Sequence, residues 1–198
     1  MKIVGITGSH RTGKTSLKEL LLERLPSSYS EINFSINQSL TRIGIDSSRM
    51  DYDFDIRKGI QTHLFNTLEQ ELKRRASFVH LARMEHSTGI IDRTPIDLAA
   101  YATIVKPIGQ EETDWVNQYI TKCIDLTNQY FSHLVHCPVF AGFVSTPKSA
   151  GESSQTYIAE VIMGILLNPA LKVPVTYLKH SNLELRYAEF IGSTYERI

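Results

Sequence analysis

The sequence predicts an α/β fold of three layers, in which helices cover both faces of a mostly parallel, five-stranded sheet. Short apolar runs alternate along the chain with longer segments of helical periodicity, and that alternation is typical of parallel sheets. The length of 198 residues suits one such domain, and no linker-like segment divides it. We therefore expect residues 1–198 to form a single domain.

Five short segments are expected as strands because each is an apolar or β-branched run that ends at turn residues. The first, KIVGIT, leads into a glycine-containing turn, and the third, GIID, ends in an acidic residue. The second has the weakest pattern of the five. The expected strands are 2–7, 31–34, 89–92, 133–137 and 173–178.

Helices are expected where apolar residues recur three or four positions apart on one face. The longest carries an apolar residue at every fourth position from Ile60 to Leu72. Two polar loops, 44–55 and the Ser/Gly/Pro-rich 141–154, are long enough to close over a site. The expected helices are 14–25, 37–43, 56–74, 80–85, 95–105, 111–131, 155–167 and 182–191.

Composition narrows the class of protein. The 21 Lys and Arg residues balance 21 Asp and Glu residues, so the formal net charge is zero. This balance, with 42% hydrophobic residues, excludes wholesale disorder and argues against long nucleic acids as partners. Two cysteines are too few for a disulfide framework, and no segment reads as a leader or a membrane span. We expect a cytoplasmic protein without a membrane partner. The apolar stripe on 111–131 packs on the core or on a second copy, which leaves a homodimer open.

Residues 8–15, GSHRTGKT, match the phosphate-binding pattern G-x-x-x-x-G-K-[ST] and are called the P-loop below. They lie between the first expected strand and helix, where backbone N–H groups and the helix N-terminus face an anion. Lys14 is expected to reach the outer phosphates, and the Thr15 hydroxyl to bind Mg²⁺. The residues expected to bind ATP are Gly8, Ser9, His10, Arg11, Thr12, Gly13, Lys14, Thr15 and Ser16.

A carboxylate and a guanidinium, Asp92 and Arg93, come at the end of the third expected strand. Because ligands of parallel sheets bind at the carboxyl ends of the strands, this pair is expected beside the P-loop. Asp92 would then bind Mg²⁺ or accept a proton from an attacking hydroxyl, and Arg93 would neutralise phosphate charge. A simpler alternative is that Asp92 caps the helix that begins near Thr94.

The P-loop followed by DRTPIDLAAY at 92–101 resembles the P-loop nucleoside and nucleotide kinases. Within that group, which includes thymidylate kinase, the NadR-like and bacteriophage-type deoxynucleotide kinases look most similar. The resemblance implies a P-loop kinase fold, ATP and Mg²⁺ as cofactors, and Lys14, Asp92 and Arg93 as catalytic residues. It also implies that Asp97 and Tyr101 line or brace the acceptor pocket.

Two looser matches concern the acceptor. Gln61 lies where the wider group often has a base-reading Gln, and Arg42 lies where NadR-like relatives often carry an Arg. Each residue also suits an ordinary helix surface or helix end. If they are functional, Arg42 and Arg93 would hold a phosphate on the acceptor, and Gln61 would contact its base.

The lid-like loop departs from the family pattern, which usually has several arginines there. Residues 141–154 hold one cation, Lys148, and no Arg. Lys148 would clamp phosphate as a point charge, without the two-pronged fork of Arg. Arg11 and Arg186 are candidates to supply the missing charge, although a charge in a terminal helix usually lies at the surface.

The sequence thus predicts an ATP-dependent phosphotransferase that acts on a small nucleotide, first of all a deoxynucleoside monophosphate. Other acceptors within the same class are a nucleoside, nicotinamide riboside, or a modified base in DNA. Alternatives from other classes are a P-loop ATPase or switch without a small acceptor, and a nucleotide-binding protein without turnover. Asp92 is followed by Arg rather than Glu, which favours transfer over hydrolysis.

Overall fold

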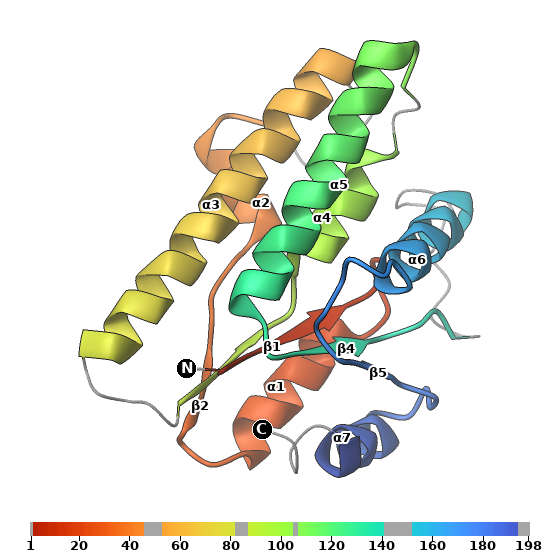
Figure 1. Ribbon diagram of the computed structural model, residues 1–198. Coiled ribbons are helices and arrows are strands. Elements are labelled where there is room, and N and C mark those ends of the chain that lie inside the picture. Colours follow the sequence, from red (N-terminus) through yellow and green to blue (C-terminus); the bar gives the residue numbers. More distant parts are fainter. Residues whose placement is uncertain (1, 46–52, 82–86, 105–106, 141–151, 194–198) are drawn as a thin grey trace.

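The computed structural model describes residues 2–45, 53–81, 87–104, 107–140 and 152–193. Each strand is followed by one or two helices along the chain (Figure 1). The strands are β1 (Lys2–Thr7), β2 (Tyr29–Glu31), β3 (Thr88–Ile91), β4 (His133–His136) and β5 (Val175–Tyr177). The helices are α1 (Lys14–Arg24), α2 (Ile36–Arg42), α3 (Phe54–Leu81), α4 (Pro95–Ala102), α5 (Gln110–Tyr130), α6 (Glu152–Leu166) and α7 (Leu183–Ser193).

The five strands form one sheet in the order β2-β3-β1-β4-β5, and every pairing within it is parallel. All five carboxyl ends therefore lie at the same edge. The register places Gly5 of the central strand opposite Ile91 of β3 on one side, and Thr7 opposite His136 of β4 on the other. The segments that follow β1, β3 and β4 consequently start side by side at that edge.

Helices cover both faces of the sheet, which gives the expected three layers (Figure 1). Helices α1 and α7 lie on one face, where Leu17 and Phe190 pack against the β1 side chains Val4 and Ile6. Helices α3 to α6 lie on the other face, over a larger core that includes Leu68 of α3. The fold class predicted from the sequence is therefore confirmed.

The second strand is the clearest difference from the sequence prediction. It spans Tyr29–Glu31 rather than 31–34, because its partner β3 begins at Thr88, which lies opposite Tyr29. Ile32 and Phe34 are buried, yet they lie beyond the strand and enter the core under α3. Their apolar pattern reflects burial in the core, although Ile32 still contacts β3, because its backbone N–H donates to the Ile90 carbonyl oxygen at 2.9 Å.

Helix α3 is also longer than expected, since it runs from Phe54 to Leu81 without the break foreseen after residue 74. Phe54 and Asp55, assigned to a loop by their polar neighbours, form its first turn. The Asp53 carboxylate accepts a hydrogen bond from the Ile56 N–H at 2.9 Å, so an Asp-rich segment here starts a helix. Each end of the remaining helices and strands lies within three residues of the expected bound, and β1 matches at both ends. Most of the expected helix 80–85 lies outside the described residues.

Two minor expectations are confirmed. Cys123 and Cys137 are buried free thiols, and burial raises the pKa of each. Trp115 is partly buried and packs on the core, stacked on Tyr119 with ring centroids 5.1 Å apart. In the part of the chain that the structure describes, every helix is too short or too polar to cross a lipid bilayer.

Candidate functional site

The P-loop connects the end of β1 to the start of α1, and two of its residues must be glycine. Gly8 has φ +149°, and a Cβ there would lie 2.4 Å from the carbonyl oxygen of Cys137. Gly13, the N-cap of α1, has φ +78° in the left-handed region. Both glycines of the motif are therefore fixed by the backbone geometry that the loop needs.

Lys14 is the buried cation at the centre of this loop. Its ammonium donates hydrogen bonds to the carbonyl oxygens of Gly8 at 2.6 Å and Ser9 at 2.5 Å. Burial, and secondarily the neighbouring Arg93, lowers the pKa of Lys14 to about 7. The Ser9 hydroxyl is also buried and has no hydrogen-bond partner among the described residues. A buried cation and an unmatched donor thus sit where the motif is expected to hold phosphate.

The Asp97 carboxylate braces the P-loop from the first turn of α4. One of its oxygens accepts a hydrogen bond from the Gly8 N–H at 3.1 Å, and the other accepts from the N–H and the hydroxyl of Thr94, each at 2.8 Å. Thr94 is the N-cap of α4, and Asp97 completes a capping box. The alternative role for Asp92, as the cap of this helix, is therefore wrong.

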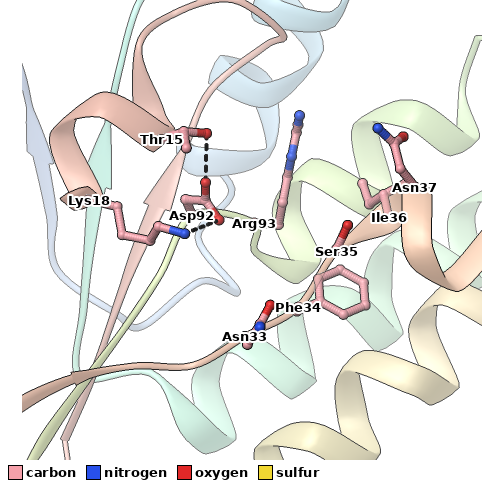
Figure 2. A pocket seen from close by; sticks show the side chains of 9 residues that line it. All are labelled: Thr15, Lys18, Asn33, Phe34, Ser35, Ile36, Asn37, Asp92 and Arg93. Atoms are coloured by element: carbon pink, nitrogen blue, oxygen red, sulfur yellow. Dashed lines mark hydrogen bonds and ion pairs between the residues drawn. The ribbon is translucent and has the colours of Figure 1, made fainter.

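Asp92 lies just beyond β3 and faces the start of α1. One carboxylate oxygen accepts a hydrogen bond from the Thr15 hydroxyl at 2.8 Å, and the other lies 3.6 Å from the Lys18 ammonium (Figure 2). Lys18 also donates to the Glu31 carboxylate at 2.5 Å. The Asp92 side chain is thus held between a hydroxyl and a cation that both come from α1.

A polar hollow of about 270 Å³ opens beside this carboxylate. Figure 2 shows α1 and Asp92 on one side of it and the connection from β2 to α2 on the other. The Arg93 side chain stands next to Asp92, and its buried Nη1 has no hydrogen-bond partner among the described residues. The lining residues are Thr15, Lys18, Asn33, Phe34, Ser35, Ile36, Asn37, Asp92 and Arg93.

The pair Thr15 and Asp92 fits the expected Mg²⁺. Hard divalent cations of this size prefer oxygen ligands and keep several waters, so one hydroxyl and one carboxylate side by side suffice on the protein. The 2.8 Å contact between these two oxygens places them within reach of one ion. Among the described residues no group of three or more His, Cys, Asp or Glu side chains gathers to hold a metal. An ion here would therefore share its coordination with a phosphate ligand.

Comparison with solved structures identifies the fold. A structure of NadR protein in complex with NR superposes with a TM-score of 0.70 at 18% identity, covering 99% of this chain and 49% of that one. Deoxyadenosine kinase from M. mycoides, with products dCMP and dCDP, gives 0.65 at 12% identity over 99% and 100% of the two chains. Thymidylate kinase from Candida albicans gives 0.62 at 15% identity over 100% and 93%.

The fold is that of the P-loop nucleoside and nucleotide kinases. No family model and no curated protein matches the sequence. The chain spans about half the length of the NadR structures that it resembles. At these identities the likeness establishes the architecture, and the P-loop kinase fold explains why residues 8–15 and 92–93 lie at one edge of the sheet.

Tyr101 of α4, another residue predicted to belong to the site, lies beside the P-loop of this kinase fold. The Tyr101 hydroxyl is 3.3 Å from Nδ1 of His10, and burial raises the pKa of that tyrosine. Arg11 adopts a left-handed backbone with φ +59°, and Ser16 is exposed in the first turn of α1. Tyr101 thus connects α4 to the P-loop. The functional roles of these residues stay predictions.

Gln61 and Arg42, the two looser predictions, lie away from the hollow beside Asp92. Gln61 is buried on α3, and its backbone carbonyl accepts a hydrogen bond from the Tyr119 hydroxyl at 2.9 Å. Arg42 is exposed at the end of α2 and lines a neighbouring hollow of about 400 Å³ with Arg74. Lys148, the cation expected in the lid, lies outside the described residues, as does most of the loop 141–154.

Lys18 is not among the site residues predicted from the sequence, and for Arg186 the sequence leaves a surface charge and a contributor to the phosphate site as alternatives. Lys18 lies four positions after Lys14 in the same expected helix, so both side chains were predictable on the same helix face. Arg186 is not a surface charge: it is 1% exposed, and it donates to the carbonyl oxygen of Thr12 at 2.6 Å. A contact across 174 positions leaves no local signal in the sequence.

On the far side of the P-loop, next to β4, lies a mainly apolar hollow of about 560 Å³. His136, at the end of β4, lines it and is 2% exposed. Its Nδ1 has no hydrogen-bond partner among the described residues, and its ring meets that of Tyr177 edge to face at 5.8 Å. Burial lowers the pKa of His136 to about 4, so the imidazole is neutral near pH 7.

Proposed function

We propose that the protein is an ATP- and Mg²⁺-dependent phosphotransferase whose acceptor is a nucleoside monophosphate, with a deoxynucleotide as the first candidate. The observation that supports this most is the hollow beside Asp92. Two cations of that hollow, Lys18 and Arg93, flank the carboxylate, and the P-loop residue Thr15 contacts it directly. A phosphate on the acceptor would be neutralised there while the P-loop holds the donor.

In this proposal the chain acts mainly by positioning and charge neutralisation. Lys14 and the P-loop N–H groups bind the donor phosphates, with Asp97 holding the Gly8 N–H in place. Thr15 and Asp92 would hold Mg²⁺, which neutralises phosphate charge when bound. Arg93 orients the acceptor phosphate, one of whose oxygens attacks the γ-phosphorus of ATP. The bond to the β-phosphate oxygen breaks, and the products are ADP and a nucleoside diphosphate.

A nucleoside or nicotinamide riboside is the second candidate acceptor. The structures of NadR protein in complex with NR and of deoxyadenosine kinase support it by likeness of fold. With such an acceptor Asp92 would take the proton of the attacking hydroxyl. The third candidate, an ATPase or switch, predicts hydrolysis that no acceptor accelerates.

An ADP-release assay with a panel of acceptors separates these candidates. The panel contains each nucleoside, each ribo- and deoxynucleoside monophosphate, nicotinamide riboside and duplex DNA, all with Mg·ATP. Acceleration by one or more monophosphates, with the diphosphate identified by chromatography, supports the proposal. Acceleration by nucleosides alone moves the assignment to the second candidate. ADP release that is the same with every acceptor and without any would overturn the kinase assignment.

A further inference from the structure

Arg186 is the residue of the last helix that reaches the P-loop. Its Nη1 donates to the Thr12 carbonyl at 2.6 Å, and its Nε donates to the His180 carbonyl at 2.8 Å. The guanidinium also lies 4.9 Å over the ring of Phe140, which follows β4. One buried side chain of α7 thus joins three segments at the carboxyl edge of the sheet: the P-loop, the connection after β5 and the segment after β4.

The position of the Thr12 carbonyl matters for the phosphate site. Thr12 lies between Arg11 and Gly13, and both neighbours have left-handed φ angles. Backbone that alternates in this way turns successive N–H groups into one concavity, with the carbonyls pointing outward. The Thr12 hydroxyl donates to the Ser9 carbonyl at 3.0 Å, which fixes the other side of the turn. A guanidinium that holds the outward carbonyl of Thr12 therefore keeps the neighbouring N–H groups pointing inward.

Burying the charged guanidinium of Arg186 costs free energy of desolvation, so its burial needs interactions that compensate for that cost. Burial lowers the pKa of this guanidinium, although the ordinary position for a charge on a terminal helix is in solvent. A guanidinium offers donors in a fixed planar fork, which suits two carbonyls in different directions better than an ammonium does. Its charge lies on the outer side of the loop, against the Thr12 carbonyl.

We propose that Arg186 is a positioning residue of the donor site: it holds the P-loop in its phosphate-binding conformation through the Thr12 carbonyl. Helix α7 then belongs to the nucleotide site, although it lies on the opposite face of the sheet from α3 to α6. This inference rests on the proposed function only in taking phosphate as the ligand of the P-loop. It makes no use of the acceptor.

A purely structural role, docking of α7 on α1, is the competing explanation, and the chain offers a matched control for it. Arg24 of α1 forms a two-pronged pair with Glu184 of α7, at 2.5 and 2.8 Å. This exposed pair joins the same two helices without touching the P-loop. Loss of helix docking would affect both arginine variants, whereas loss of P-loop geometry would affect only variants of Arg186.

The test is calorimetric binding of Mg·ATP and, separately, of inorganic tripolyphosphate to wild type, Arg186→Gln, Arg186→Lys and Arg24→Gln. For Arg186→Gln we expect the Kd for both ligands to rise at least about tenfold, the loss of one charged hydrogen bond. Arg186→Lys keeps the charge and should fold, but one ammonium cannot hold both carbonyls, so a rise of about threefold or more is expected. Arg24→Gln should stay within about twofold of wild type.

The outcomes separate this inference from the proposed function. If both Arg186 variants lower the melting temperature but bind both ligands as wild type does, Arg186 only docks α7, and the inference is wrong. If Arg24→Gln weakens binding as much as Arg186→Gln, helix docking explains the effect, and the inference is again wrong. If wild type binds both ligands but phosphorylates no acceptor, the proposed function fails. The comparison of the Arg186 variants then still decides whether Arg186 positions the P-loop. Failure of wild type to bind either ligand overturns both.

Discussion

The carboxylates of Asp97 and Asp92 differ in the number of hydrogen bonds that they accept. Asp97 accepts bonds from Gly8 and from both donors of Thr94 and is fully buried, so it has little capacity left for a ligand. Asp92 accepts one hydroxyl and lies at the wall of an open hollow. The geometry therefore assigns bracing to Asp97 and leaves Asp92 available for chemistry.

Substitution of these two carboxylates separates the roles. For Asp92→Asn we expect Mg·ATP binding within about threefold of wild type and phosphoryl transfer reduced at least about 100-fold. For Asp97→Asn we expect a lower melting temperature and weaker ATP binding, because the amide cannot accept all three hydrogen bonds. Calorimetry and the ADP-release assay measure both effects. Transfer that survives in Asp92→Asn would remove Asp92 from the catalytic assignment.

Lys14 permits a prediction about protons. With a pKa of about 7 it is mostly neutral at pH 8, and bound phosphate favours its charged form. Binding of Mg·ATP at pH 8 should therefore take up about 0.9 of a proton at this residue. Titration calorimetry in Hepes and in Tris, whose ionisation enthalpies differ, measures that uptake. Arg in place of Lys stays charged, so Lys14→Arg should abolish the uptake; an unchanged uptake in that variant would contradict the assignment.

Helix α4 links the sheet to the P-loop, because its capping box contains the carboxylate that holds Gly8. Its N-cap, Thr94, is fully buried, whereas the Ser35 N-cap of α2 makes an exposed 3.3 Å bond to the Gln38 N–H. The two N-caps differ in burial: an N-cap hydroxyl caps a buried helix in α4 and a surface helix in α2.

We expect Thr94→Val, which keeps the shape of the side chain, to lower the free energy of unfolding by about 2 kcal/mol, because it leaves Asp97 short of a donor. Ser35→Ala should lower it by about 0.5 kcal/mol. Urea denaturation followed by circular dichroism measures both values. Equal losses in the two variants would mean that burial adds nothing to the α4 cap.

Elements that carry their own local signal were predictable from the sequence. The P-loop, the apolar stripe of α3 and the strand before Asp92 each show their periodicity or motif within a few residues. The second strand was misplaced because burial under α3 and pairing with β3 produce the same apolar pattern. Pairing depends on where β3 starts, and that information lies about 60 positions further along the chain.

At the scale of the whole molecule, the site is assembled from the carboxyl edge of the sheet. Thr15, Asp92 and Arg186 come from three distant parts of the chain, and the parallel register brings them to one side. The sequence motif predicted the first two because the fold places all strand ends together. Arg186 belongs to no motif and was only one of several candidate cations, because its position follows from the packing of α7 on α1. The shape of the hollow beside Asp92 is likewise encoded by no motif.

His136 makes the stability of the whole fold sensitive to acid. Its pKa is about 4 in the folded protein, because it is buried, and about 6.5 in an unfolded chain. Above pH 6.5 the imidazole is mostly neutral in both states, so the free energy of unfolding keeps its full value. As the pH falls from 6.5 towards 4, His136 binds a proton in the unfolded chain but not in the folded protein. The free energy of unfolding therefore falls.

Between pH 7 and pH 5 this difference should lower the free energy of unfolding by about 2 kcal/mol. Urea unfolding of wild type and His136→Gln at both values measures it, because the other titrating groups contribute equally to both proteins. The glutamine variant, which binds no proton, should lose about 2 kcal/mol less than wild type over that interval. Equal losses in the two proteins would mean that the His136 imidazole is protonated as readily in the fold as in the unfolded chain, and that β4 tolerates a charge beside the P-loop.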